Sequence, residues 1–289
     1  MLLKTGETSA SIACNSCGCP AEVNAYEIER RKKVLGAKET LIDADSGASG
    51  GTLPLSGVIK ETLSVVWDKR IGLFQALILV SMALVGLELI YAYLLANEPS
   101  IFSSMLYIIP YVMLFTLFAV TCHRIVLLGN TEVPKYGIFS WSKRETRFLG
   151  WTIVGYLFFT LITMFVGVFV IPIITLDSST ELTYVISLAI LVPGGYVLSR
   201  LSILFPATAV DERPNLKWAW NITSGNGWKL FLIVALLPQL VSAIYVFVDW
   251  PEHLIIQFAI GLLTYALVAI EVAALSVSYR FLNRKVDAV

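Results

Sequence analysis

Residues 71–95 read IGLFQALILVSMALVGLELIYAYLL, and this stretch decides the fold. It contains no Lys or Arg and a single acidic residue, Glu88. A helix needs about 20 predominantly apolar residues to cross a hydrocarbon core about 30 Å thick, so the run is long enough to span a membrane. Five further runs have a similar length and apolar character: 103–127, 149–175, 182–205, 230–248 and 254–279. The sequence therefore predicts an all-α integral membrane protein with a six-helix transmembrane bundle.

The overall composition agrees with lipid as the solvent of this chain. Of its 289 residues, 57% are hydrophobic and 15% are charged, whereas a soluble protein is about 45–50% apolar and about 25% charged. The 21 basic and 21 acidic residues cancel. We therefore expect the lipid bilayer as the main partner, membrane proteins as further partners, and no nucleic acid.

The basic residues lie on one side of the predicted spans. The loops at 97–100, 177–181 and 249–253 contain no Lys or Arg, and all 21 basic residues fall in the segments on the other side. Cytoplasmic loops of membrane proteins carry an excess of Lys and Arg. We therefore expect a multi-pass membrane protein with the N-terminus and the C-terminus both in the cytoplasm.

The chain divides into a polar segment, 1–52, and a membrane domain, 53–285. The polar segment lacks the apolar residues needed to offset the entropy of ordering, so we expect it to be disordered apart from a short helix over 21–39. It holds three closely spaced cysteines: Cys14, Cys17 and Cys19. Structural zinc requires four ligands and no second pair follows, so we predict no metal and no cofactor.

Tryptophan and arginine recur at similar intervals, which predicts an internal repeat. Trp residues before the first, third and fifth spans are 74 and 77 residues apart: Trp67, Trp141 and Trp218. Arg residues that end the second, fourth and sixth spans are 76 and 80 residues apart: Arg124, Arg200 and Arg280. Trp228 follows Trp218 by ten residues, as Trp151 follows Trp141. We predict three repeats, each an interfacial helix followed by a transmembrane hairpin. The alternative is that these residues are only the interfacial anchors found in any multi-span protein.

The first interfacial helix has the clearest pattern. One face carries apolar residues and the other polar ones; the apolar set is Val58, Ile59, Leu63, Val66 and Trp67. Such a helix lies among the lipid headgroups with its apolar face toward the acyl chains.

Two acidic residues and two glutamines inside the apolar runs are candidates for structural or functional roles. Glu88 lies about 27 Å along its helix from Arg70, at 1.5 Å per residue, so we expect it to reach the outer headgroups. Glu271 lies nine residues before Arg280 and is deep enough that a lipid-facing position is costly. It is either a structural hydrogen-bonding group or a functional site. Gln239 and Gln257 are expected to hydrogen-bond between helices.

The fourth span contains Pro193, Gly194 and Gly195. Proline removes a backbone hydrogen bond, so this triplet predicts a kink or an unwound turn. Unwound turns of this kind mark substrate sites in some transporters. We expect Glu271 to face the interior of the bundle beside this turn.

Residues 206–232 contain a motif that resembles a recurring element of uncharacterised bacterial inner-membrane proteins. It consists of Leu216, Ala219, Trp220, Thr223, Gly225, Asn226 and Trp228. The element is similar to the membrane domain found beside some glycerophosphodiester phosphodiesterases. The resemblance implies a six-helix membrane module over residues 53–285 and brings no catalytic residues, because the phosphodiesterase barrel is absent.

No phosphate-binding loop, zinc-protease motif or nucleophile elbow occurs in the chain. We therefore expect a protein that is not an enzyme: a membrane module in envelope or lipid homeostasis, or a scaffold. The alternative is a transporter of small solutes or lipids with a path near Glu271 and Pro193.

Overall fold

The computed structural model describes residues 9–13, 20–24, 53–97, 100–129, 141–176, 192–236 and 253–286. The chain separates into two units, Met1–Gly51 and Thr52–Val289, which are treated separately below.

The first unit contains a β-hairpin. Strand β1 (Ser9–Ala13) pairs antiparallel with β2 (Pro20–Asn24), with Ser9 opposite Asn24. Residues 9–13 therefore form a strand where disorder was expected, and residues 21–24 form a strand where a helix was expected. Pro20 is compatible with the second strand, because proline is tolerated at the first residue of a strand. The three cysteines and the remainder of the predicted 21–39 helix lie outside the described residues.

Among the described residues of the second unit, four helices are long and apolar enough to cross a membrane. They are α3 (Arg70–Asn97), α4 (Ile101–Leu128), α5 (Lys143–Leu176) and α11 (Leu254–Val286). They cover the predicted spans 71–95, 103–127, 149–175 and 254–279, which confirms a helical membrane protein. Of the predicted spans 182–205 and 230–248, only residues 192–205 and 230–236 are described, so the six-helix count stays a prediction.

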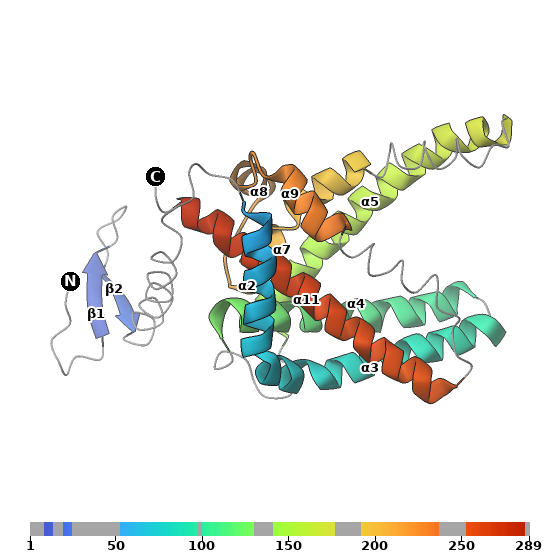
Figure 1. Ribbon diagram of the computed structural model, residues 1–289, viewed down its shortest axis with the longest axis horizontal. Helices are drawn as coiled ribbons and strands as arrows, with labels where there is room; N and C mark the ends of the chain where they lie inside the picture. Colours follow the sequence, from blue (N-terminus) through green and yellow to red (C-terminus); the bar gives the residue numbers. More distant parts are fainter. Residues whose placement is uncertain are drawn as a thin grey trace. The chain divides into compact units, whose positions relative to one another are not determined.

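Helices α3 and α4 form a hairpin whose turn is fixed by serine (Figure 1). The Ser100 hydroxyl accepts a hydrogen bond from the Ser103 N–H, and the Ser103 hydroxyl accepts one from the Ser100 N–H. This reciprocal capping box satisfies two donors that a helix N-terminus otherwise leaves open.

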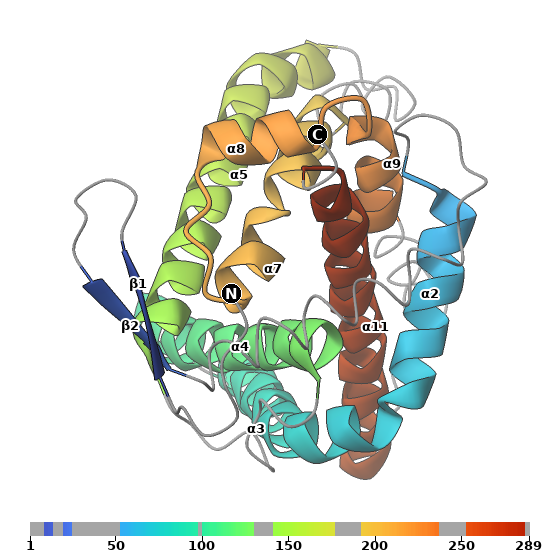
Figure 2. The ribbon, with the colours of Figure 1, turned by 90° about the vertical axis from the view of Figure 1, so that its left-hand side faces the viewer.

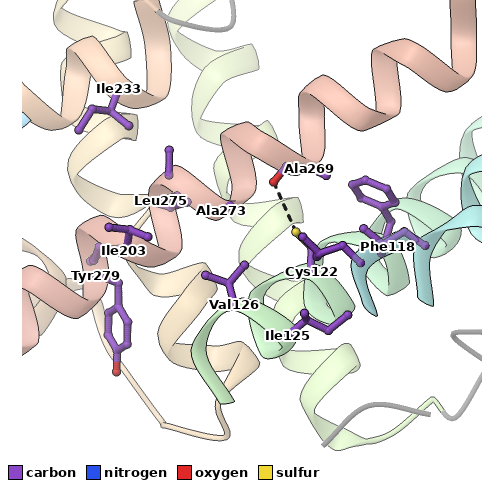
Figure 3. Packing of buried hydrophobic residues seen from close by; sticks show 14 of the residues in the cluster. Phe118, Cys122, Ile125, Val126, Ile203, Ile233, Ala269, Ala273, Leu275 and Tyr279 are labelled. Atoms are coloured by element: carbon purple, nitrogen blue, oxygen red, sulfur yellow. Dashed lines mark hydrogen bonds between the residues drawn. The ribbon is translucent and has the colours of Figure 1, made fainter. Parts of the chain in front are cut away.

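Helix α11 packs against this hairpin at short range. A Cβ at Gly261 would lie 2.7 Å from Cγ1 of Val85 on α3, so only glycine allows this approach. Further along, Cys122 Sγ on α4 donates to the Ala269 carbonyl at 3.5 Å (Figure 3). His123 Nδ1 lies 2.7 Å from Ser276 Oγ, and both side chains are buried.

The last third of α11 is the centre of the second unit. Every residue from Ala273 to Tyr279 is buried, and a helix that is buried on all sides has neighbours on all sides. Figure 2 shows α11 between helix α2 (Leu55–Asp68) and helices α7 (Leu204–Ala209) and α8 (Leu216–Ile222). The core here combines small residues of α11 with branched side chains such as Ile203 and Ile233 (Figure 3).

Helix α2 runs across the direction of α3 and α4 (Figure 1). Val58 and Thr62 on one face are buried, whereas Ile59, Leu63 and Trp67 are exposed. The chain then turns at Lys69 and enters α3.

Several short helices lie between α5 and α11 in the chain. A helix over residues 192–201 leads into α7 and α8, which are followed by α9 (Gly227–Phe231) and a π-helical turn η3 (Leu232–Leu236). A π turn is one way in which a membrane helix accommodates a proline, and Pro238 follows two residues later in the sequence.

Candidate functional site

Many of the described Lys and Arg residues of the second unit lie where α3 begins, α4 ends, α5 begins and α11 ends; this is called the basic end. The others lie on α2 and on residues 200–229. The last carbonyls of a helix have no partner within the helix. At the end of α4, Lys69 Nζ donates to the carbonyls of Ile125 (2.8 Å) and Val126 (3.0 Å). Arg280 Nη2 donates to the Val126 carbonyl at 2.7 Å. Two cations therefore cap one helix C-terminus, where positive charge is favoured by the helix dipole.

Arg280 also joins α11 to α2. Its Nη1 lies 3.1 Å from Glu61 Oε1, and both side chains are largely buried. The guanidinium therefore bridges α2 and the end of α4, and it holds three helices in one arrangement. Burial together with the nearby positive charge of Arg280 lowers the pKa of Lys69 to about 8.

The N-terminal side of α2 is held as firmly. The Leu53 N–H donates to Asn226 Oδ1 at 2.6 Å, and Lys229 Nζ donates to the Leu53 carbonyl at 2.7 Å. Asn226 is itself buried. Helix α2 is thus held at three points: by Leu53 before its first residue, by Glu61 within the helix, and by Lys69 after its last residue.

The exposed face of α2 is apolar. Ile59, Leu63 and Trp67 are 52%, 56% and 68% exposed and are spaced four residues apart, which aligns them along one side of the helix. These three residues are called the α2 stripe. The Arg70 guanidinium lies 4.6 Å from the centre of the Trp67 ring. An apolar stripe bordered by tryptophan and arginine fits a lipid headgroup region.

A second group of arginines holds the loop after α7. Arg124 and Arg144 lie 3.1 Å and 3.2 Å from Asp211 Oδ2, and Arg124 also donates to the Ala209 carbonyl. Asp211 has φ +69°, a left-handed conformation that Asp tolerates better than most residues. Tyr279 of α11 donates to Glu212 Oε1 at 2.6 Å. This loop therefore ties α4, α5 and α11 together.

Arg200 holds α8 in place through similar contacts. Its Nε donates to Thr223 Oγ1 at 2.9 Å, and its Nη2 donates to the Trp220 carbonyl. The guanidinium also stacks 3.6 Å from the centre of the Trp220 ring, a cation–π contact. The predicted interfacial arginines Arg124, Arg200 and Arg280 therefore each donate to a backbone carbonyl of another segment.

The motif that carries the family resemblance is a structural connector. Thr223 and Asn226 accept the bonds described above, and Ala219 is buried. Gly225 has φ +75°, where a side chain is strained. Trp228 packs against Tyr196, with ring centres 4.9 Å apart.

The predicted tryptophan anchors differ in environment. Trp67 and Trp228 are exposed, as an interfacial anchor requires. Trp141 donates from Nε1 to Thr146 Oγ1 at 2.9 Å just before α5. Trp218 packs against the main core cluster instead.

The structure corrects the prediction of an unwound turn at 193–195, because residues 192–201 are continuously helical. The glycines allow close packing instead. A Cβ at Gly194 would lie 3.3 Å from Ile162 Cδ1 of α5, and one at Gly195 would lie 2.9 Å from Phe231 of α9. Pro193 itself is exposed.

Glu271 is half-buried on α11 and makes no hydrogen bond or ion pair with another described residue. No described bond joins it to residues 193–195. Gln257 is partly buried and has polar contacts. Gln239 lies outside the described residues.

Glu88 has a partner that the sequence analysis missed. Tyr265 of α11, which is buried, donates its hydroxyl to Glu88 Oε1 at 2.6 Å. Helix α3 continues to Asn97, so Glu88 lies about 13 Å inside the helix end at 1.5 Å per residue. Within the protein the Glu88 carboxylate therefore accepts a hydrogen bond from a neighbouring helix, and its expected position at the outer headgroups stays a prediction.

Comparison with family models, curated proteins and solved structures finds no match for this chain. The function is therefore inferred from the geometry of the chain itself.

Proposed function

We propose that this chain is a multi-pass protein of the bacterial inner membrane whose basic end lies at the cytoplasmic side, with both termini in the cytoplasm. The proposal includes six spans arranged as three two-span repeats. It is supported by the gathering of the described Lys and Arg side chains at one end of the four long helices and by the preference of such residues for the cytoplasmic side.

Within that topology we propose a non-enzymatic membrane module that serves envelope or lipid homeostasis, or scaffolds membrane partners, through α2. The observation that carries the proposal is the fixation of α2 at three points, Leu53, Glu61 and Lys69, while its apolar stripe is left exposed. An amphipathic helix that only covers a membrane surface needs no such fixation. A fixed one holds its stripe at a constant depth among the headgroups, where it can engage lipids of the inner leaflet.

Lipid retention tests this proposal. The protein is purified in mild detergent as wild type and as an Ile59→Ser, Leu63→Ser, Trp67→Ser variant, and bound phospholipid is quantified by mass spectrometry. The matched control replaces two exposed polar residues of the same helix, Lys60→Gln and Ser64→Ala. We expect the stripe variant to lose tightly bound phospholipid and the control to retain it. Equal retention by all three folded proteins would remove the basis of the proposal.

A second candidate function, transport of a small solute or lipid, is favoured by Glu271. This carboxylate lies within a span and has no partner among the described residues, and ionisable groups in spans commonly line substrate or ion paths. We propose the path near Glu271 and Pro193. Uptake into proteoliposomes tests it: Glu271→Gln should abolish uptake while the protein stays folded. Retained uptake in that variant would exclude Glu271 from the path.

A further inference from the structure

In the half of the membrane domain opposite the basic end, a polar centre is built around Glu88. Among the described residues, α3 after Arg70, α4 before Arg124 and α11 before Arg280 contain no Lys or Arg, and Arg70 lies about 27 Å away along α3. A carboxylate at this depth costs roughly 2.5–3.5 kcal/mol on insertion scales unless it is neutralised. Tyr265 satisfies Oε1, whereas Oε2 has no hydrogen bond with any described residue.

Tyrosines surround this carboxylate from more than one helix. The ring of Tyr91, one turn beyond Glu88 on α3, stacks on Tyr107 of α4 with centres 4.1 Å apart and planes 15° apart. Tyr107 in turn lies 5.1 Å from Tyr111. Glu88 is close enough to both Tyr107 and Tyr111 to act on them electrostatically. The rings of Tyr91, Tyr107 and Tyr111 are partly exposed.

The aromatic set continues toward the basic end. Tyr111, Phe115 and Phe118 follow one another along α4 with ring centres 6.1 Å and 6.2 Å apart. Phe118 then meets Tyr265 edge to face at 5.7 Å. The hydroxyl that positions Glu88 therefore belongs to a ring that the same aromatic series holds in place, so the carboxylate has a defined orientation.

A carboxylate beside a cluster of tyrosine rings is the chemistry that binds an organic cation. The carboxylate supplies the opposite charge, and the electron-rich ring faces attract the cation while contacting its apolar groups. A metal ion would instead require several oxygen ligands in its immediate shell. We propose that Glu88, together with Tyr91, Tyr107 and Tyr111, forms a binding site for a lipophilic organic cation, with Tyr265 as the residue that positions the carboxylate.

The proposed site explains why the region around Glu88 is both polar and partly exposed. Tyr156 on α5, which is within electrostatic reach of Tyr107 and Tyr111, is 73% exposed. A lipophilic cation dissolved in the bilayer meets these rings without crossing the protein core.

Equilibrium binding of radiolabelled tetraphenylphosphonium to the full-length protein in mild detergent tests the site. Wild type should bind saturably. Glu88→Gln keeps an acceptor for Tyr265 and should bind at least about tenfold more weakly, since it loses the charge. Tyr107→Leu should also bind more weakly, whereas Asp68→Asn, which neutralises an exposed acid at the end of α2, should bind as wild type does.

Two results would overturn the proposal: no saturable binding by folded wild-type protein, or equal affinity in wild type and Glu88→Gln. Thermal unfolding of each variant verifies that it is folded. The inference is independent of α2, so loss of phospholipid from the stripe variant and loss of tetraphenylphosphonium from Glu88→Gln are separate results.

Discussion

The two ends of the membrane domain use polar residues in opposite ways. At the basic end, Lys69, Arg124, Arg200 and Arg280 all donate to backbone carbonyls, and acidic partners such as Glu61 balance two of them. In the other half, Glu88 is held by a single tyrosine hydroxyl. Charge at the basic end fixes helix positions, whereas charge in the other half remains available for a ligand.

The largest loss of stability is expected from a substitution at Arg280. Arg280→Met leaves Glu61 without its cation and removes one cap from α4. The pair is largely buried, so we expect the free energy of unfolding to fall by about 2–3 kcal/mol, between the values of exposed and buried pairs. Unfolding by SDS in mixed micelles measures it. Arg213→Ala, at an exposed position of the same end, should stay within about 0.5 kcal/mol of wild type; an equal loss in both variants would contradict a specific role for Arg280.

Asn226 tests the attachment of α2. Asn226→Leu removes the acceptor of the buried Leu53 N–H, and an unsatisfied buried donor costs about 1–3 kcal/mol. We expect that loss of stability together with faster amide hydrogen exchange at residues 53–58. The control is Asn221→Ala, at an exposed side chain in α8. Unchanged exchange in Asn226→Leu would mean that α2 is held without this bond.

The Glu88 pair should be less important for stability. Tyr265→Phe removes one hydrogen bond and should lower the free energy of unfolding by about 1 kcal/mol. Glu88→Gln keeps an acceptor and should be close to neutral. Tyr156→Phe, at an exposed position, is the control. A loss from Glu88→Gln as large as that from Arg280→Met would remove the contrast between the two ends.

Lys69 gives an effect that appears as a pH dependence rather than as a fixed loss of stability. Its pKa is about 8 in the folded protein and 10.5 for an ordinary lysine. Between these values the unfolded chain holds a proton that the folded protein has released, so the free energy of unfolding should rise with pH across this window. Lys69→Met should remove the rise, and Lys60→Met, at an exposed position of α2, should leave it. Identical pH profiles for wild type and Lys69→Met would contradict the lowered pKa.

Sequence patterns predicted the elements of this fold better than their contacts. The apolar runs gave α3, α4, α5 and α11 because length and composition alone define a helix that crosses a membrane. The arginine positions at helix ends were also predictable. Their acceptors were not, because Arg280 and Val126 are 154 residues apart and periodicity carries no information about such pairs.

The intramembrane acids show the same limit. Distance from Arg70 placed Glu88 near the outer headgroups, but its partner Tyr265 is 177 residues away, on a helix whose packing the sequence does not reveal. Likewise, Pro193-Gly194-Gly195 indicated a kink or an unwound turn, whereas residues 192–201 are helical and the glycines serve the close approach of Ile162 and Phe231. Composition shows that a small residue is present but not which neighbour requires it.

The most direct test of the central claim measures where the two faces of α2 lie. Single cysteines replace Ser64, on the polar side, and Leu63, in the α2 stripe, in a protein whose Cys14, Cys17 and Cys19 are changed to serine. A membrane-impermeant maleimide is then applied to intact cells and to inverted membrane vesicles. A fixed interfacial helix on the cytoplasmic side predicts rapid labelling of Ser64→Cys in inverted vesicles only, and slow labelling of Leu63→Cys in both. Labelling of Ser64→Cys in intact cells, or equal rates at the two positions in vesicles, would contradict the account.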